Sequence, residues 1–295
     1  MTTPSDLSTN SAASPTSLSE VREWTSNLPP PVVIFNKSHS GSRLLAELVR
    51  ASGIYMGAHQ NESGDSEDML ELVEYVVEHY YPDFNQLWRG NQSPDVELCA
   101  LITRACRRHL DGRPTQRWGW KLSETTYVLP LVDYLFPKAR YLHLIRDGRD
   151  IAFSDHVPPF NTFWQKIYTD AAGMRYWHGL WFGRMSKLAY RIDPLPYNVQ
   201  HWINSVTVGR HFGAMLRERY METRYEDLCL RFDVEALRIL SFIDAPSAAT
   251  AIASLRSEVA LTAIGKFRHR LPWQRWRAER LARPLLMSLG YLRKR

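Results

Sequence analysis

The segment from Tyr141 to Ser154, with the sequence YLHLIRDGRDIAFS, joins an apolar run to a charged turn. The apolar run predicts a buried strand, Asp147-Gly148 predicts a turn, and Arg149 to Ser154 can open a helix. Arg146 at the end of the strand and Ser154 in the helix could converge on one anion, because arginine offers a planar set of donors and serine an adaptable hydroxyl. A phosphate-rich ligand would then lie across the strand ends. Taken alone, the segment fits a surface ion-pair cluster equally well.

A second strand–loop–helix pattern lies near the N-terminus, from Pro31 to Gly53. Val32 to Phe35 is apolar and rich in β-branched and aromatic residues, which predicts a buried strand. Apolar residues at helical spacing after Arg43 predict a helix that Gly53 ends. Backbone N–H groups of such a loop and helix start can cradle a phosphate, and Gly41 allows close approach of the backbone. A serine-rich N-cap on an ordinary amphipathic helix is the alternative.

The candidate anion ligands of this loop are its polar, basic and small residues: Lys37, Ser38, His39, Ser40, Gly41, Ser42 and Arg43. The loop does not match the P-loop of nucleotide triphosphatases, which requires GxxxxGK followed by serine or threonine. The first glycine is missing, and Gly41 is followed by Ser42 and Arg43. A P-loop-type small-molecule kinase is therefore kept only as an alternative function.

Together the two segments resemble the bacterial-type sulfotransferases that use PAPS (3′-phosphoadenosine 5′-phosphosulfate). That family has a 5′-phosphosulfate loop of the type K/R-S/G-G-T-T/R, which resembles the run from His39 to Arg43. Its 3′-phosphate site has the pattern R-D-x-R-D-x-x-x-S. This chain matches that pattern position by position with Arg146, Asp147, Arg149, Asp150 and Ser154.

Three shorter segments resemble the same family and follow in its order, so that the resemblance covers about residues 31–271. WGWKL resembles the strand with the active-site lysine, here Lys121, and RYEDL, which contains Tyr225, resembles the family's YEDL segment. IGKFRHRL resembles the loop that folds over the nucleotide, here Gly265, Lys266, Phe267 and Arg268. The departures from the family pattern are His39 for a basic residue, Phe267 for tryptophan, and Ser123 where a catalytic histidine is common.

The resemblance implies transfer of a sulfuryl group from PAPS to a hydroxyl or amine of a small-molecule, lipid or carbohydrate acceptor, with release of PAP (3′-phosphoadenosine 5′-phosphate). The 39–43 loop, with Lys37, would hold the 5′-phosphosulfate, and Lys121 would contact the bridging or sulfuryl oxygens. Arg146 and Ser154 would hold the 3′-phosphate, and the 265–268 segment would close over it. No metal is implied, because lysine and arginine supply the countercharge.

The base that accepts the proton of the acceptor is left open by the departure at Ser123. The candidates, in order of preference, are Asp65, Glu124, Glu62 and His39. Asp65 and Glu62 could equally be N-cap groups of the helix that follows them, and Glu124 could cap the helix that starts at Thr125.

Strands that alternate with helices predict one α/β domain with a central, mainly parallel sheet flanked by helices, similar to the P-loop NTPases. Residues 1–28, rich in serine and threonine, are predicted to be a disordered tail, and residues 29–295 to be the sulfotransferase-like domain. A helical pattern from Ser66 to His109 is interrupted near Pro82 and Pro94. The aromatic residues between 158 and 196 are expected to form part of the core and part of an acceptor wall.

The composition fits a basic, soluble enzyme. The 295 residues are 44% hydrophobic, with a net charge of +6 and a pI of about 9.2, which suits an anionic nucleotide. Three scattered cysteines suggest neither a disulfide framework nor a zinc site. Neither a membrane-spanning run nor a signal peptide is recognisable, so we expect a cytoplasmic location.

The basic C-terminal helix predicted over residues 273–295 allows a second class of function. Its arginines, with Trp273 and Trp276, could bind an anionic lipid surface or nucleic acid. We favour a helix packed on the domain, because Leu281, Leu285, Leu286 and Leu289 form an apolar stripe. We therefore expect no specific nucleic-acid partner and keep peripheral membrane contact as an open alternative.

Overall fold

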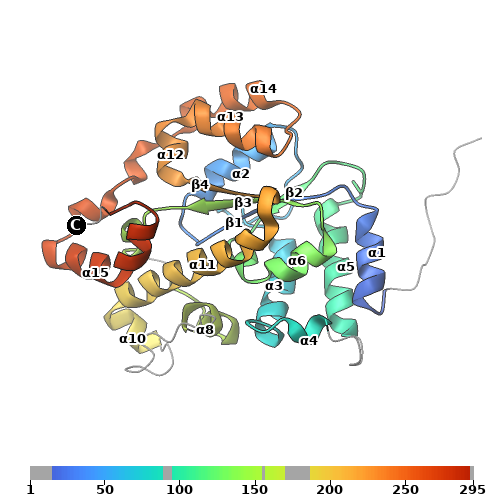
Figure 1. The fold of residues 1–295 in the computed structure, drawn as a ribbon, viewed down its shortest axis with the longest axis horizontal. Helices are drawn as coiled ribbons and strands as arrows, with labels where there is room; N and C mark the ends of the chain where they lie inside the picture. Colours follow the sequence, from blue (N-terminus) through green and yellow to red (C-terminus); the bar gives the residue numbers. More distant parts are fainter. Residues whose placement is uncertain (1–14, 89–94, 155–156, 170–186, 293–295) are drawn as a thin grey trace, which may run out of the picture.

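The computed structural model describes residues 15–88, 95–154, 157–169 and 187–292. Its centre is a four-stranded sheet in the order β2-β1-β3-β4 (Figure 1). The strands are β1 (Val32–Asn36), β2 (Gly119–Lys121), β3 (Arg140–Ile145) and β4 (Tyr220–Arg224). Each neighbouring pair is parallel, so the predicted α/β fold with a mainly parallel sheet is confirmed.

Helices cover both faces of the sheet and follow the strands in alternation. The α-helices are α1 (Leu18–Ser26), α2 (Ser42–Ala51), α3 (Glu67–His79), α4 (Asn85–Trp88), α5 (Val96–Leu110), α6 (Leu129–Leu135), α7 (Gly148–Ile151), α8 (Thr162–Thr169), α10 (Lys187–Ile192), α11 (Pro194–Leu216), α12 (Tyr225–Leu230), α13 (Phe232–Phe242), α14 (Ala248–Leu255) and α15 (Pro272–Ser288). Short 3₁₀ helices are η1 (Ser123–Tyr127), η2 (Arg217–Arg219), η3 (Arg256–Glu258), η4 (Leu261–Ala263) and η5 (Lys266–His269).

The alternation of side chains along β1 explains why the strand must be buried. Val33 and Phe35 pack into one core with residues of α3, α5 and α6, and Val32 and Ile34 pack into another with residues of α2 and α13. All five residues of the strand are buried. A parallel strand covered on both faces reads as a continuous apolar run, which is why β1 and β3 could be recognised from the sequence.

The predicted disordered tail of residues 1–28 is wrong for its second half. Ser17 caps α1 by accepting a hydrogen bond from the backbone N–H of Glu20, and Val21 and Thr25 are buried. The Thr25 hydroxyl donates to the Leu135 carbonyl over 2.9 Å. The segment is polar overall, but one buried face is enough for a short helix to pack stably on the domain. Residues 1–14 lie outside the described part of the chain.

The helix expected to open between Arg149 and Ser154 is also shorter than predicted. α7 ends at Ile151, and Ser154 lies in the segment that follows it. The helix expected to start at Thr125 is likewise divided into η1 and α6. Within the described residues no helix combines the length and apolar character needed to span a bilayer.

The C-terminal helix packs on the domain, as we favoured. Ala278, Ala282 and Leu286 of α15 are buried in a cluster with residues of α7 and α11, and Leu281 and Leu285 pack against its edge. The helix ends at Ser288 rather than continuing to residue 295. Small alanines in the stripe allow α15 to approach α11 closely.

Candidate functional site

A cleft of about 410 Å³ opens at the carboxyl ends of β1 and β2. Ligands of parallel α/β sheets bind at this edge, where loops rather than strands present their polar groups. The cleft is lined by Ser38, His39, Gly41, Ser42, Arg43, Asn61, Glu62, Ser63, Asp65, Ser66, Glu67, Leu70, Lys121, Leu122, Ser123, Glu124 and Trp164. Nine of the residues predicted as site residues from the sequence, counting Glu62, are therefore brought together.

The loop after β1 presents its backbone to this cleft. His39 and Gly41 have left-handed backbone angles, with φ of 68° and 83°, and α2 begins directly after them at Ser42. The ring of Tyr225 packs so closely on Gly41 that a Cβ atom there would lie 2.2 Å from Cε2 of the ring. Glycine is therefore required at this position both by the backbone angle and by space.

Lys37 and Ser40, two of the predicted anion ligands, do not line the cleft. The ammonium group of Lys37 is buried and donates to the Ser38 hydroxyl over 3.0 Å and to the Ser38 carbonyl over 3.1 Å. The Ser40 hydroxyl donates to the Lys37 carbonyl over 2.6 Å. Burial lowers the pKa of Lys37 to about 7. Both side chains brace the loop from behind rather than face a ligand.

Lys121 ends β2 and pairs with Asp65 inside the cleft. Its Nζ lies 2.9 Å from Oδ1 of Asp65 and donates to the Ser63 carbonyl over 3.0 Å. The Ser66 N–H donates to the Lys121 carbonyl over 2.8 Å, which ties the loop before α3 to the strand. Ser66, not Asp65 or Glu62, is the N-cap residue of α3, so the capping alternative for these two carboxylates is wrong.

Glu124 lies in η1 at the buried wall of the cleft. Burial, with the nearby charge of Asp65, raises the pKa of its carboxyl group to about 7. Trp164 of α8 and Leu70 of α3 add apolar surface to the same cleft. Trp164 belongs to the aromatic-rich stretch expected to form part of the core and part of an acceptor wall, and Phe163 and Tyr168 of the same stretch are buried in the core. Four other aromatic residues of that stretch, Tyr176, Trp177, Trp181 and Phe182, lie outside the described residues.

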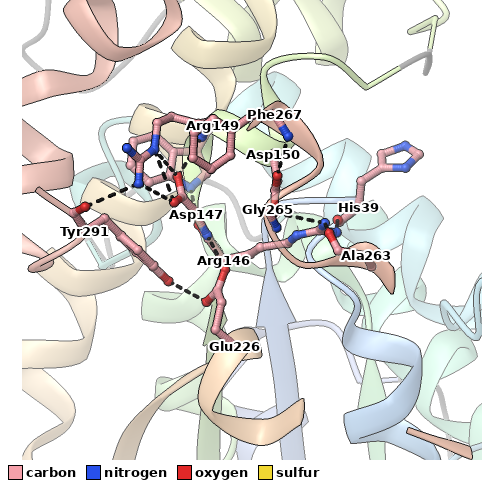
Figure 2. A network of polar contacts seen from close by, with 11 residues as sticks. His39, Arg146, Asp147, Arg149, Asp150, Glu226, Ala263, Gly265, Phe267 and Tyr291 are labelled. Atoms are coloured by element: carbon pink, nitrogen blue, oxygen red, sulfur yellow. Dashed lines mark hydrogen bonds and ion pairs between the residues drawn. The ribbon is translucent and has the colours of Figure 1, made fainter. Parts of the chain in front are cut away.

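Arg146 follows β3 and contacts the β1 loop through the His39 carbonyl (Figure 2). Its Nη1 donates to the His39 carbonyl over 3.1 Å, and its Nη2 donates to Asp150 over 3.3 Å and to the Ala263 carbonyl. The guanidinium lies 4.9 Å from the centre of the Tyr225 ring. One side chain therefore contacts three residues, His39, Tyr225 and Ala263, each of which is more than 75 positions away from it in the sequence.

Asp150 holds the C-terminal loop in place. Its buried carboxylate accepts hydrogen bonds from the backbone N–H groups of Gly265 over 2.8 Å and Phe267 over 3.0 Å (Figure 2). The Phe267 ring lies 4.3 Å below the guanidinium of Arg149, which pairs with Asp147 over 2.7 Å. The sequence motif contained Asp150 but gave no sign of this role, because its partners lie 115 and 117 residues away.

The remaining predicted residues lie around this network rather than in the cleft. The Ser154 carbonyl accepts a hydrogen bond from Asn198 over 3.1 Å, so α11 fixes the segment after α7. Asn198 had no recognisable signal in the sequence. Lys266 and Arg268 are exposed on η5. The structure thus joins Arg146, Tyr225, Gly265 and Phe267 into one cluster and leaves Lys266 and Arg268 at its surface.

The fold of this chain is similar to that of solved structures. No protein-family model matches the sequence, and no curated protein matches it either. The sulfotransferase domain from the curacin biosynthetic pathway matches the structure with a TM-score of 0.51 and 15% identity, over 90% of this chain and 100% of that one. The chain has the sulfotransferase fold.

Two further solved structures match this chain with lower TM-scores. A sulfotransferase from Alicyclobacillus acidocaldarius matches with a TM-score of 0.46 and 14% identity, over 90% of this chain and 96% of that one. Retinol dehydratase in complex with androsterone and inactive cofactor PAP matches with a TM-score of 0.40 and 14% identity, over 94% of this chain and 87% of that one. In this sulfotransferase fold, the β1 loop and the Arg146 cluster lie next to each other.

Proposed function

We propose that this protein transfers a sulfuryl group from PAPS to a hydroxyl or amine of a small-molecule, lipid or carbohydrate acceptor and releases PAP. The observation that carries the proposal is the hydrogen bond from Arg146 to the His39 carbonyl, over 3.1 Å. It joins Arg146, predicted to hold the 3′-phosphate, to the loop predicted to hold the 5′-phosphosulfate. PAPS has a 5′-phosphosulfate and a 3′-phosphate on one ribose, and a pair of adjacent anion sites suits such a nucleotide.

The 5′-phosphosulfate would bind in the cleft. There the backbone at Gly41, the start of α2 at Ser42 and the side chain of Arg43 offer donors and positive charge. Lys121, at the end of the neighbouring strand, would donate to the oxygen that bridges sulfur and phosphorus. Negative charge builds on that oxygen as the sulfur–oxygen bond breaks, so a fixed ammonium group stabilises the transition state more than the ground state.

The 3′-phosphate would bind at Arg146 and Ser154, with the side chain of Arg268 closing over it. The Gly265 N–H, which donates to Asp150, would hold that segment in position. The bonds to His39, Asp150 and Ala263 use three of the five N–H donors of Arg146. Its buried Nε has no hydrogen-bond partner among the described residues. An incoming phosphate oxygen would satisfy a donor that is otherwise costly to bury.

The acceptor must lose a proton while a new bond forms from its oxygen or nitrogen to sulfur. Asp65 is the best-placed base, because its carboxylate lines the cleft 2.9 Å from the Lys121 ammonium that would mark the reacting sulfuryl group. Glu124 is the second choice, since a pKa of about 7 is matched to proton transfer at neutral pH. Glu62 and His39 also line the cleft and follow in that order.

The test is a transfer assay with sulfur-labelled PAPS in EDTA and a panel of phenols, sugars, amines and hydroxylated lipids. We expect label in at least one acceptor and stoichiometric release of PAP. A thermal-shift series runs beside it, with PAP in EDTA and with Mg-ATP. Stabilisation by Mg-ATP alone would contradict the proposal and favour a kinase.

A further inference from the structure

The start of α15 exposes large apolar side chains to solvent. Leu271, Trp273 and Trp276 are 57%, 58% and 60% exposed, although tryptophan is normally well buried in a soluble domain. At 3.6 residues per turn, Trp273 and Trp276 lie on the side of the helix opposite Ala278, Ala282 and Leu286, which pack on the domain. The packed helix therefore turns both tryptophans outward.

The same surface is positively charged. Arg270 and Arg280 are exposed beside these residues, and the guanidinium of Arg280 lies 5.1 Å from the centre of the Trp276 ring. Glu279 is the acidic residue of the 266–280 segment, and its carboxylate lies 3.6 Å from Arg149 and 3.7 Å from Arg283. The charge between Lys266 and Arg280 is thus mainly basic, and its one carboxylate, Glu279, is paired with arginines although its side chain is 36% exposed.

The neighbouring helix α10 also exposes large apolar side chains. Leu188 and Ile192 of α10 are 69% and 75% exposed. Asp193, the next residue in the chain, forms an ion pair with Arg277 of α15. Figure 1 shows α10 and α15 near the same end of α11. The two helices therefore lie close together, and each has exposed apolar side chains.

We propose that Arg270, Leu271, Trp273, Trp276 and Arg280, here called the Trp–Arg face, bind an anionic lipid bilayer. Tryptophan is favoured at the level of the lipid headgroups because its ring is amphipathic. Arginine is attracted to anionic headgroups, and a helix that combines both on one face lies in the interface plane. The exposed leucine and isoleucine side chains favour a bilayer over nucleic acid, since aliphatic groups gain little from a phosphate backbone.

The Trp–Arg face lies close to the candidate nucleotide site. The face begins directly after η5. Asp150 accepts from the N–H groups of Gly265 and Phe267 at the start of η5, and Ala263 of the preceding η4 accepts from Arg146. A bilayer bound there would lie close to the segment that borders the candidate nucleotide site. Lipid binding itself does not depend on the proposed transfer reaction, and its test needs no acceptor.

The experiment is co-sedimentation of the full chain with phosphatidylcholine vesicles, with and without phosphatidylglycerol. We expect binding to the anionic vesicles that weakens as salt rises. The double variant W273A/W276A should abolish most of this binding. R270Q/R280Q should weaken it more than tenfold, because each arginine contributes about fivefold near an anionic surface.

The matched control is V234A/L237A, which shortens two apolar side chains of α13 that are 62% and 54% exposed. It should bind vesicles like the parent chain. Thermal unfolding of all variants checks that each is folded. Absence of binding to anionic vesicles, or equal binding by W273A/W276A, would overturn the proposal. So would an oligonucleotide that binds this face more tightly and displaces the vesicles.

Discussion

The substitution Gly41→Ala tests how the β1 loop is built. The added Cβ would lie 2.2 Å from Cε2 and 2.5 Å from Cδ2 of the Tyr225 ring, where real Cβ atoms are never found. The φ angle of 83° adds backbone strain for any residue with a side chain. The Tyr225 ring also lies 4.9 Å from the guanidinium of Arg146, so the clash should displace the residue proposed to hold the 3′-phosphate.

The expected magnitude has two parts. A left-handed alanine costs roughly 1–2 kcal/mol, and overpacking against a buried ring costs about 1–3 kcal/mol more. Gly112→Ala is the matched control, because Gly112 has φ of 74° and nothing within 4 Å of its would-be Cβ. It should show the strain alone. The free energy of unfolding should therefore fall by about 2–5 kcal/mol for Gly41→Ala and by roughly 1–2 kcal/mol for Gly112→Ala.

The assays are urea unfolding and calorimetric titration with PAP. We expect PAP to bind Gly41→Ala at least about tenfold more weakly, a loss of about 1.4 kcal/mol, and to bind Gly112→Ala normally. Shortening the ring with Tyr225→Leu in the Gly41→Ala background should recover part of the stability. Equal destabilisation by the two glycine substitutions, with PAP binding kept in both, would refute the packing argument.

Three further changes test the site. Asp150→Asn removes the charge that holds the Gly265 and Phe267 N–H groups, so PAP affinity should fall by about 1.5–3 kcal/mol by calorimetry, and an unchanged affinity would exclude this role. Lys121→Ala should lower turnover about a hundredfold or more with little change in PAP affinity, and a normal rate would remove the lysine from the chemistry. Burial raises the pKa of Glu124 from 4.5 to about 7, so its contribution to stability is present below pH 4.5 and is lost as the pH rises through about 7. As the pH rises from 4.5 to about 7, the free energy of unfolding of Glu124→Gln should therefore increase relative to that of the parent. A difference between the two that stays constant with pH in urea unfolding would contradict the burial argument.

The strands β1 and β3 and the general fold could be predicted because local sequence decides them, whereas β4 has a single buried residue and no apolar run, and it was not predicted. The apolar run of β3 and the run at Val32 to Phe35 allow few structures other than buried parallel strands, and the structure places β1 and β3 side by side. The turn residues after them place a loop at the same edge of the sheet. Convergence of Arg146 and the 39–43 loop follows from that topology.

The direction of individual side chains could not be predicted. Lys37 and Ser38 are neighbours in a polar loop, yet Lys37 is buried and Ser38 lines the cleft. The difference is set by the loop's backbone angles, including the left-handed His39, which composition does not reveal. A polar side chain in such a loop either faces a ligand or forms hydrogen bonds within the loop, and only the folded structure distinguishes the two.

Long-range contacts were also invisible in the sequence. The bonds from Asp150 to the 265–267 backbone depend on where α15 and η5 return to the sheet. The helix at Leu18 to Ser26 was missed because its composition is polar and its stability comes from tertiary packing of Val21 and Thr25. The local sequence does not reveal which distant residues Asp150 or the Leu18–Ser26 helix contacts.

The most direct test of the central claim is calorimetric titration of PAP and of 5′-AMP in EDTA, with the parent chain, Arg146→Ala and the control Arg104→Ala. Arg104 forms an exposed ion pair with Glu71, and neither residue is among those that line the cleft. We predict that PAP binds the parent and the control more tightly than 5′-AMP does, and that Arg146→Ala reduces this preference by about 1.5–3 kcal/mol. Equal affinities for PAP and 5′-AMP in the parent, or an unchanged preference in Arg146→Ala, would contradict a 3′-phosphate site at Arg146.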